Sequence, residues 1–120
     1  MAIRGIRGAI TVKTNTKEAI LLATEVLLNS IFLKNSVKVD EIACIIFTLT
    51  HDLNAEFPAQ AARLLGLNST PLLCASEIKV KGAIKKCLRV LVLFNSSKPQ
   101  TKMKHVYLEG AKKLRPDIKS

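Results

Sequence analysis

The spacing of apolar residues changes along the chain, and each spacing predicts a different element. Between residues 17 and 31, apolar side chains recur three or four positions apart, which is the period of a helix with one buried face. This face consists of Ile20, Ala23, Leu27 and Ile31, widened by Leu21, Leu22, Val26 and Leu28. Because the face is so wide, we expect the helix, placed at 13–36, to pack on more than one surface. Asn15 or Thr16 can cap its start, and Glu18 lies favourably in its first turn.

Shorter apolar runs predict strands. The four runs cover residues 2–12, 42–50, 70–78 and 85–94. Between the second and third runs, "PAQAARLLG" predicts a short helix at 58–66, because Pro58 suits a first turn and Gly66 suits a helix end.

The C-terminal quarter predicts a last helix and a tail. The helix is placed at 98–111, with an inner face of Met103, Val106, Tyr107 and Ala111. The order β-α-β-α-β-β-α favours an α+β fold in which a single mixed β-sheet is packed with helices. We expect one domain over residues 1–120, with a mobile polar tail from about residue 112.

The composition is that of an ordinary globular domain, with 48% hydrophobic and 23% charged residues. The apolar stretches are too short to span a bilayer, and the N-terminus lacks the uninterrupted apolar segment of a secretion signal. Cys44, Cys74 and Cys87 have no CxxC spacing, which argues against a metal knuckle or a disulfide framework. We therefore expect a cytoplasmic protein with no metal site.

The net charge of +10 is concentrated in one half of the chain. Residues 1–60 hold six basic and six acidic side chains, whereas residues 61–120 hold thirteen basic and three acidic ones. Such asymmetry indicates an anionic partner. The candidates are nucleic acid, a membrane surface or a small polyanionic ligand.

Several arginines stand in apolar or glycine-flanked settings. Arg89 interrupts the apolar run "KKCLRVLVLF", and Arg7, Arg63 and Arg115 have apolar or glycine neighbours. A guanidinium among apolar residues either extends to water on its apolar stem or meets an anion. Together, these four predict a pocket for a ligand that carries more than one carboxylate or phosphate. The common phosphate-loop, dinucleotide, zinc-protease and nucleophile-elbow motifs are not present.

A set of motifs in one order resembles a known family. The motifs are "IRGIRGA", "FPAQAAR", "PLLCASEI", "KKCLRV" and "HVYLEGAKKLRPD". This combination, spread over nearly the whole chain, resembles the small monofunctional chorismate mutases, which form trimers of a mixed-sheet pseudo-α/β-barrel fold. The resemblance implies rearrangement of chorismate to prephenate on the route to phenylalanine and tyrosine. It also implies a homotrimer with active sites between subunits, no cofactor and no metal. With only five aromatic residues and no nucleic-acid-binding motif, we expect no nucleic-acid partner, and we expect no membrane partner.

The resemblance also implies roles for individual residues. Arg7 and Tyr107 would hold the carboxylate of the enolpyruvyl side chain, and Arg89 would reach the ether oxygen and a carboxylate. Glu77 and the region of Cys74 would engage the ring hydroxyl. The cavity walls would be Phe57, Ala59, Leu72, Leu73 and Leu114, with positive charge at the mouth from Arg63 and Arg115.

Two positions depart from the family pattern, and two other functions stay open. Gln60 stands where the family commonly has lysine, and Leu73 replaces a more polar residue. Loss of a cation at position 60 could weaken capture of the dianion. The alternatives are a basic nucleic-acid-binding module, prompted by the charged second half, and a related trimer with a different small-molecule activity.

Overall fold

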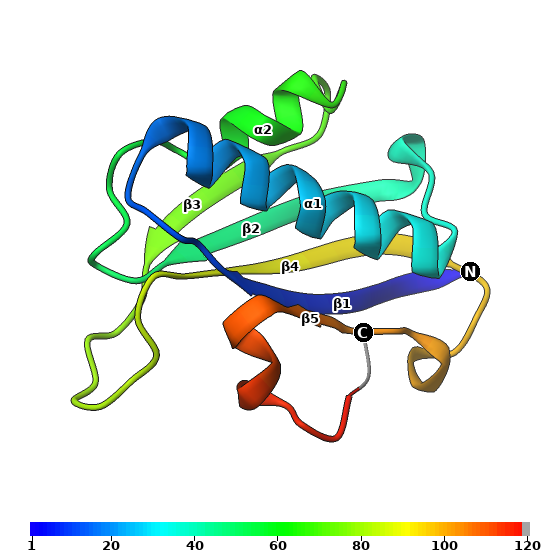
Figure 1. Ribbon diagram of the computed structural model, residues 1–120. Helices are drawn as coiled ribbons and strands as arrows, with labels where there is room; N and C mark the ends of the chain where they lie inside the picture. The colour runs from blue at the N-terminus through cyan, green and yellow to red at the C-terminus, as the bar shows by residue number, and fades with distance from the viewer. Residues whose placement is uncertain (119–120) are drawn as a thin grey trace.

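A five-stranded mixed sheet forms the centre of the molecule (Figure 1). The computed structural model describes residues 1–118. The strands are β1 (Ala2–Thr11), β2 (Ile42–Leu49), β3 (Leu72–Ser76), β4 (Cys87–Ser96) and β5 (Val106–Leu108). Their order is β3-β2-β4-β1-β5, with β4 antiparallel to β1 and β2, and with β3 and β5 parallel to their neighbours. The predicted α+β fold with one mixed sheet is confirmed, and the four predicted strands lie within two residues of the observed bounds.

Helices α1 (Lys17–Asn35) and α2 (Ala59–Leu64) pack together on one face of the sheet (Figure 1). Both confirm predicted helices. Of the two cap candidates, Thr16 caps α1, since its hydroxyl accepts a hydrogen bond from the Ala19 amide at 3.2 Å. Asn15 instead accepts hydrogen bonds from the amides of Asn54 and Ala55, and so ties the start of the helix to the loop after β2.

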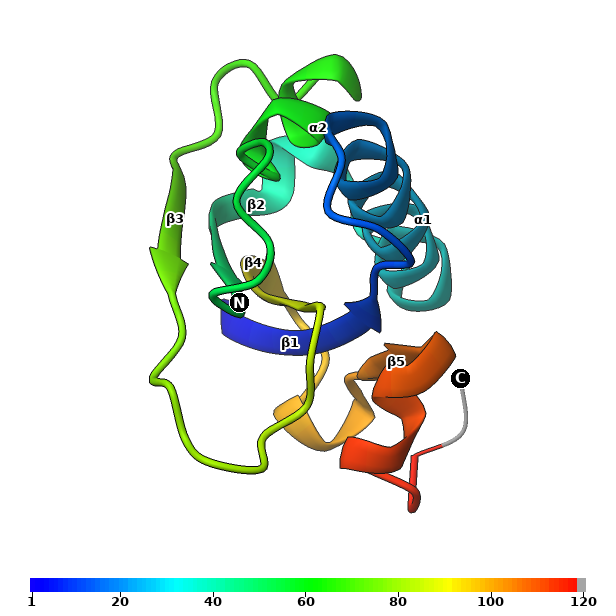
Figure 2. The same ribbon diagram turned by 60° about the vertical axis from the view of Figure 1, so that its left-hand side comes forward.

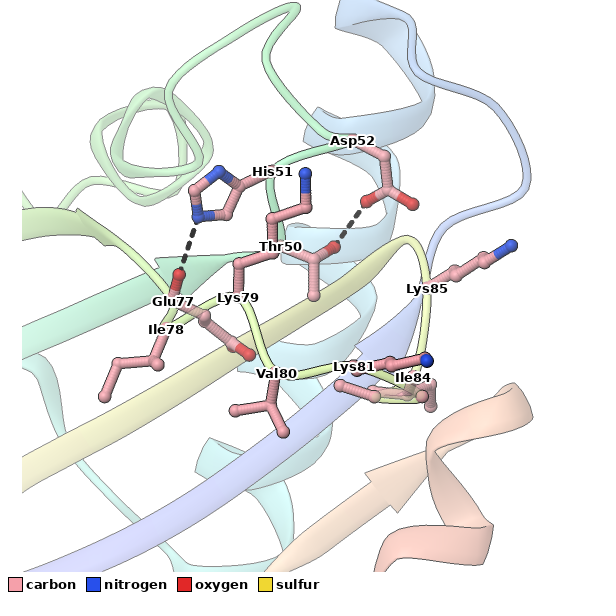
Figure 3. Close-up of a pocket in the computed structure, with 12 residues that line it drawn as sticks. Thr50, His51, Asp52, Glu77, Ile78, Lys79, Val80, Lys81, Ile84 and Lys85 are labelled. Atoms are coloured by element: carbon pink, nitrogen blue, oxygen red, sulfur yellow. Dashed lines mark hydrogen bonds between the residues drawn. The ribbon is translucent and has the colours of Figure 1, made fainter.

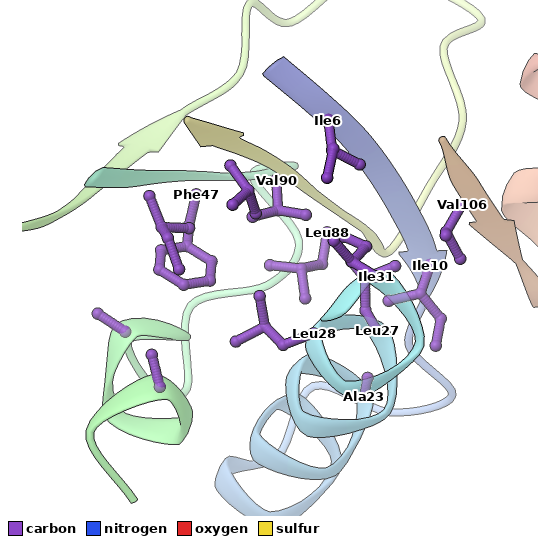
Figure 4. Packing of buried hydrophobic residues seen from close by; sticks show 14 of the residues in the cluster. Ile6, Ile10, Ala23, Leu27, Leu28, Ile31, Phe47, Leu88, Val90 and Val106 are labelled. Atoms are coloured by element: carbon purple, nitrogen blue, oxygen red, sulfur yellow. The ribbon is translucent and has the colours of Figure 1, made fainter. Parts of the chain in front are cut away.

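The main core lies between α1 and the sheet (Figure 4). The predicted helix face is buried there, and it meets inward side chains of β4 such as Leu88 and Val90. Leu22 and Val26, however, are 62% and 46% exposed. The second packing surface predicted for α1 is therefore not covered by the described residues of this chain.

Alternation along β4 gives the sheet a second, different face. Leu88, Val90, Val92 and Phe94 are buried toward the helices, while Arg89, Leu91 and Leu93 are half-buried on the other side. The outer face is defined as the side of the sheet opposite α1. Among the described residues, the C-terminal segment packs on this face around Ala9 and Cys87, and Figure 2 shows that segment on the side of β1 away from α1. Of the candidate arginines, Arg7 and Arg89 lie on this outer face.

The prediction of a helix at 98–111 is wrong. This segment contains the 3₁₀ turns η2 (Gln100–Lys102) and η3 (Glu109–Leu114), with β5 between them. The reason is the open edge of β1, whose backbone groups need partners. The Gln100 side chain hydrogen-bonds the amide and carbonyl of Gly5, the His105 ring accepts from the Arg7 amide, and β5 continues the pairing from Gly8 onward.

The polar C-terminal segment begins inside η3. Residues 112–114 belong to this turn, and Ile118 packs against the small outer cluster formed around Ala9, Cys87, Tyr107 and Ala111. Mobility of the segment from residue 112 stays a prediction, and its last two residues lie outside the described part of the chain. Within residues 1–118, no helix combines the length and the apolar character needed to cross a membrane.

Candidate active site

Arg7 and Tyr107 meet on the outer face through strand pairing. Arg7 lies on β1, and β5 runs parallel beside it, with Ala9 paired to Tyr107. The Arg7 guanidinium donates to the Tyr107 hydroxyl from Nη2 at 2.8 Å and from Nε at 3.3 Å. The phenol ring is buried while Arg7 stays exposed, so the tyrosine fixes the direction of a cation that a ligand can reach.

Arg89 forms the second half of the cluster. It pairs with Ala9 on one side and with Thr48 on the other, so its side chain shares the outer face with Arg7. Its Nε atom lies 3.1 Å from Oε2 of Glu77, and its side chain is 42% exposed. Among the described residues, however, this Nε makes no well-directed hydrogen bond. Arg89 therefore lies close to a carboxylate, and the hydrogen-bonding capacity of its Nε is still not satisfied by that carboxylate.

A cavity of about 310 Å³ joins the two arginines. Arg7, Arg89, Thr48 and Tyr107 supply its polar groups, and its apolar lining includes Ile46 and Leu91. Two guanidinium groups beside apolar walls suit a small ligand with two anionic groups and an apolar body. Within residues 1–118, no group of three or more His, Cys, Asp or Glu side chains could hold a metal ion.

The C-terminal segment adds charge beside this cavity. Leu114 packs against the outer cluster around Tyr107, and Arg115 forms an ion pair with Asp117 at 2.9 Å. His105 lies next to Arg7, and burial lowers its pKa, with the positive charges of Arg7 and Arg115 acting in the same direction. Its Nδ1 accepts from the Arg7 amide, which requires an unprotonated Nδ1.

A second, larger cavity of about 660 Å³ lies beside Glu77, between the end of β2 and the loop 77–86 (Figure 3). His51 Nε2 lies 2.8 Å from the Glu77 carbonyl oxygen, and Asp52 accepts hydrogen bonds from the Lys86 amide at the far end of the loop. Lys79, Lys81 and Lys85 lie along this cavity. The loop therefore presents positive charge next to the carboxylate that contacts Arg89.

The other predicted site residues, apart from Leu73, lie away from the cluster. Phe57, Ala59 and Arg63 belong to the α2 region on the helix-covered side; Phe57 is 69% exposed and Ala59 is in the main core. Leu72 and Cys74 pack against the same core. Leu73 alternates to the outer face, where it is 61% exposed beside Ile46.

Thr48 belongs to this site and is missing from the sequence prediction. Its hydroxyl donates to Glu77 Oε2 at 2.7 Å, and it borders the cavity of the two arginines. The available signal was weak: Thr48 is the first polar residue of an otherwise apolar strand, followed by Leu49 and Thr50. Its pairing opposite Arg89 depends on sheet register, which local sequence does not give.

The fold and the cavity define an α+β domain in which two arginines and a tyrosine border a cavity that suits a small anionic ligand, with Glu77 next to Arg89. The family model described as chorismate mutase type I matches residues 3–118. The chain is 48% identical to the chorismate mutase AroH of Thermus thermophilus, over 98% of each chain. It is 44% identical to chorismate mutase AroH of Bacillus subtilis, over 98% of this chain and 94% of that one. A solved chorismate mutase from Clostridium thermocellum superposes with a TM-score of 0.89 at 49% identity, covering 90% of this chain and 96% of the other.

This chain belongs to the type I chorismate mutase family. It is therefore an isomerase of aromatic amino-acid biosynthesis, and chorismate is its substrate.

Proposed function

We propose that the rearrangement of chorismate to prephenate takes place in the cavity between Arg7 and Arg89. In this reaction a C–O bond breaks and a C–C bond forms within one molecule, with no proton transferred. Arg7, oriented by Tyr107, holds the enolpyruvyl carboxylate, and Glu77 accepts a hydrogen bond from the ring hydroxyl. Holding the folded conformer removes the rotational freedom that slows the reaction in water.

Arg89 is the proposed electrostatic catalyst. C–O cleavage runs ahead of C–C formation, so negative charge grows on the ether oxygen. A cation already in place stabilises that charge more in the transition state than in the ground state. The observation that carries this role is the position of Arg89 on the cavity wall, with a buried Nε that Glu77 approaches but does not saturate.

The proposed site is completed by a neighbouring subunit of a homotrimer. Phe57 and Arg63 come from the helix-covered side of the sheet, so in one chain they do not share the outer-face cavity. Exposed apolar side chains on the outer face, among them Ile3 and Leu73, support burial of this face against another copy. In that arrangement Phe57 approaches the cavity from the neighbour, and Arg63 lies at its mouth.

The role of Arg89 is tested by following chorismate absorbance with purified variants. Arg89→Ala should raise the barrier by at least ~3 kcal/mol, which is the scale of a lost oxyanion donor. Arg89→Lys should also be slow, because an ammonium does not reproduce the planar guanidinium fork. Near-normal turnover in either variant, with no metal or nucleotide added, would remove Arg89 from the mechanism.

The shared site is tested in the same assay by mixing subunits. Arg89→Ala and Arg63→Ala chains, each impaired alone, are unfolded together, refolded and assayed. If a site takes Arg89 from one chain and Arg63 from the next, about a quarter of the sites in a random mixture are intact. If the mixture is no more active than the average of its parents, a site does not take Arg89 from one chain and Arg63 from another.

We further expect a cytoplasmic enzyme of one domain, without a nucleic-acid or membrane partner. The basic second half then serves the substrate, because lysines of the loop 77–86 raise the local concentration of a dianion near the cavity. Steep, salt-dependent binding of single-stranded RNA would instead favour the nucleic-acid alternative. Indifference to prephenate and to a bicyclic transition-state mimic would favour a different small-molecule activity.

A further inference from the structure

The carboxylate of Glu77 is held by a strand neighbour that no predicted role includes. Thr48 lies on β2 directly opposite Arg89 on β4, and its hydroxyl donates to Glu77 Oε2 at 2.7 Å. The same Oε2 atom lies 3.1 Å from Arg89 Nε. Among residues 1–118, both of these contacts of the carboxylate use Oε2, which leaves Oε1 for a ligand.

We propose that Thr48 is a positioning residue that restrains Glu77 and keeps Arg89 available to the substrate. This inference rests on the proposed roles of Glu77 and Arg89. A carboxylate free to rotate beside a guanidinium frequently forms two parallel hydrogen bonds with it. By holding Oε2, Thr48 limits the pair to one contact, in which Arg89 Nε lacks a well-directed hydrogen bond. The unsaturated guanidinium can then bind the ether oxygen as its charge develops.

The backbone of Glu77 is fixed independently of Thr48. The Glu77 amide donates to the Leu49 carbonyl at 3.0 Å, and the His51 ring lies 2.8 Å from the Glu77 carbonyl (Figure 3). Removal of the Thr48 hydroxyl therefore changes the freedom of the carboxylate and leaves the path of the chain in place. This separation makes the inference testable with an isosteric substitution.

The central experiment compares Thr48→Val with Thr48→Ser. Valine has the shape of threonine without the hydroxyl, and a hydrogen bond to a charged group is worth about a tenfold effect or more. We expect Thr48→Val to lower kcat about tenfold with KM little changed, as for an interaction expressed in the transition state. Serine keeps the donor and should restore most of kcat. Equal losses in both variants, or wild-type kcat in Thr48→Val, would overturn the proposal.

A matched control removes a threonine hydroxyl outside the site. Thr24 is fully buried in α1, and its hydroxyl donates to the Ile20 carbonyl at 2.7 Å. Thr24→Val makes the same chemical change and should leave kcat unchanged. Circular dichroism on all variants separates loss of folding from loss of turnover, and a folded Thr48→Val enzyme with low kcat is the result expected.

Coupling to Glu77 separates this inference from the proposed function. In a Glu77→Gln background there is no carboxylate to restrain, so adding Thr48→Val should change kcat by less than about twofold. The same tenfold loss in both backgrounds would show that Thr48 acts elsewhere. If Glu77→Gln turns over like the wild type, the proposed role of Glu77 fails and this inference with it. If Glu77→Gln is slow and Thr48→Val is normal, only the inference fails.

Discussion

Replacing Gly8 with alanine should loosen the contact between α1 and β1. Gly8 is buried where the helix crosses the strand that carries Arg7. A Cβ atom added there would lie 2.8 Å from Ile31 Cδ1, 3.1 Å from Leu27 Cδ1 and 3.1 Å from the Val106 carbonyl oxygen. The first distance is well inside van der Waals contact, which begins near 3.5 Å between carbon atoms.

The surroundings of Gly8 have little room to adjust. Ile31 and Leu27 are fully buried, and the Val106 carbonyl belongs to the strand paired with β1 at Gly8. Overpacking of this kind costs about 1–3 kcal/mol. Alanine also has less conformational freedom than glycine in the unfolded chain, which stabilises the folded protein by about 0.4–1 kcal/mol. We therefore expect Gly8→Ala to lower the free energy of unfolding by about 1–2 kcal/mol.

Urea unfolding at one fixed protein concentration measures this change, and a second variant tests its cause. Ile31→Val removes the Cδ1 atom at 2.8 Å and alone costs about 0.5–1.5 kcal/mol. If the clash is the cause, the double variant should be more stable than the sum of the single losses by about 1 kcal/mol. Simple additivity, or a neutral Gly8→Ala, would refute the steric explanation.

Two further predictions concern titrating groups. Since the folded chain lowers the His105 pKa from 6.5, mainly through burial, its contribution to stability is present above pH 6.5 and is lost as the pH falls. His105→Gln should reduce the difference in unfolding free energy between pH 7 and pH 5, and an unchanged difference would contradict this. Burial raises the pKa of the Cys87 thiol to about 11, so an aromatic disulfide reagent at pH 8 should modify Cys87 far more slowly in the folded than in the urea-unfolded protein. Cys87→Ala identifies that slow thiol, and equal rates in both states would count against its burial.

The parts of the fold that the sequence predicts are those with a strong local signal. Helix α1 has both an apolar period and a capping threonine, and β4 is an apolar run of the length of a strand. Segment 98–111 misleads because its apolar spacing also fits a helix. Its conformation is decided by Gln100 and His105, which bond to β1 about a hundred residues earlier in the chain.

The site also contains residues that the local sequence predicts and residues that it does not predict. An arginine inside an apolar strand is visible in the sequence, and so is the chemistry that it suits. The bond between Tyr107 and Arg7 depends on β5, and the position of Thr48 depends on the register between β2 and β4. Sheet register follows from the whole set of strand contacts, so the residues that orient the arginines are harder to predict than the arginines themselves.

The setting of Arg89 shows how a strand can carry a charge among apolar neighbours. Leu88 and Val90 turn into the core, while Arg89 turns to the outer face, where it is partly solvated and faces Glu77. Water and Glu77 therefore offset most of the free energy of desolvating this charge before any ligand binds. A fully paired guanidinium would gain little from an anionic ether oxygen, whereas an unpaired one would have been costly to keep in place. A single contact that leaves Nε unsaturated lies between these limits, and it suits a group whose stabilisation is needed mainly in the transition state.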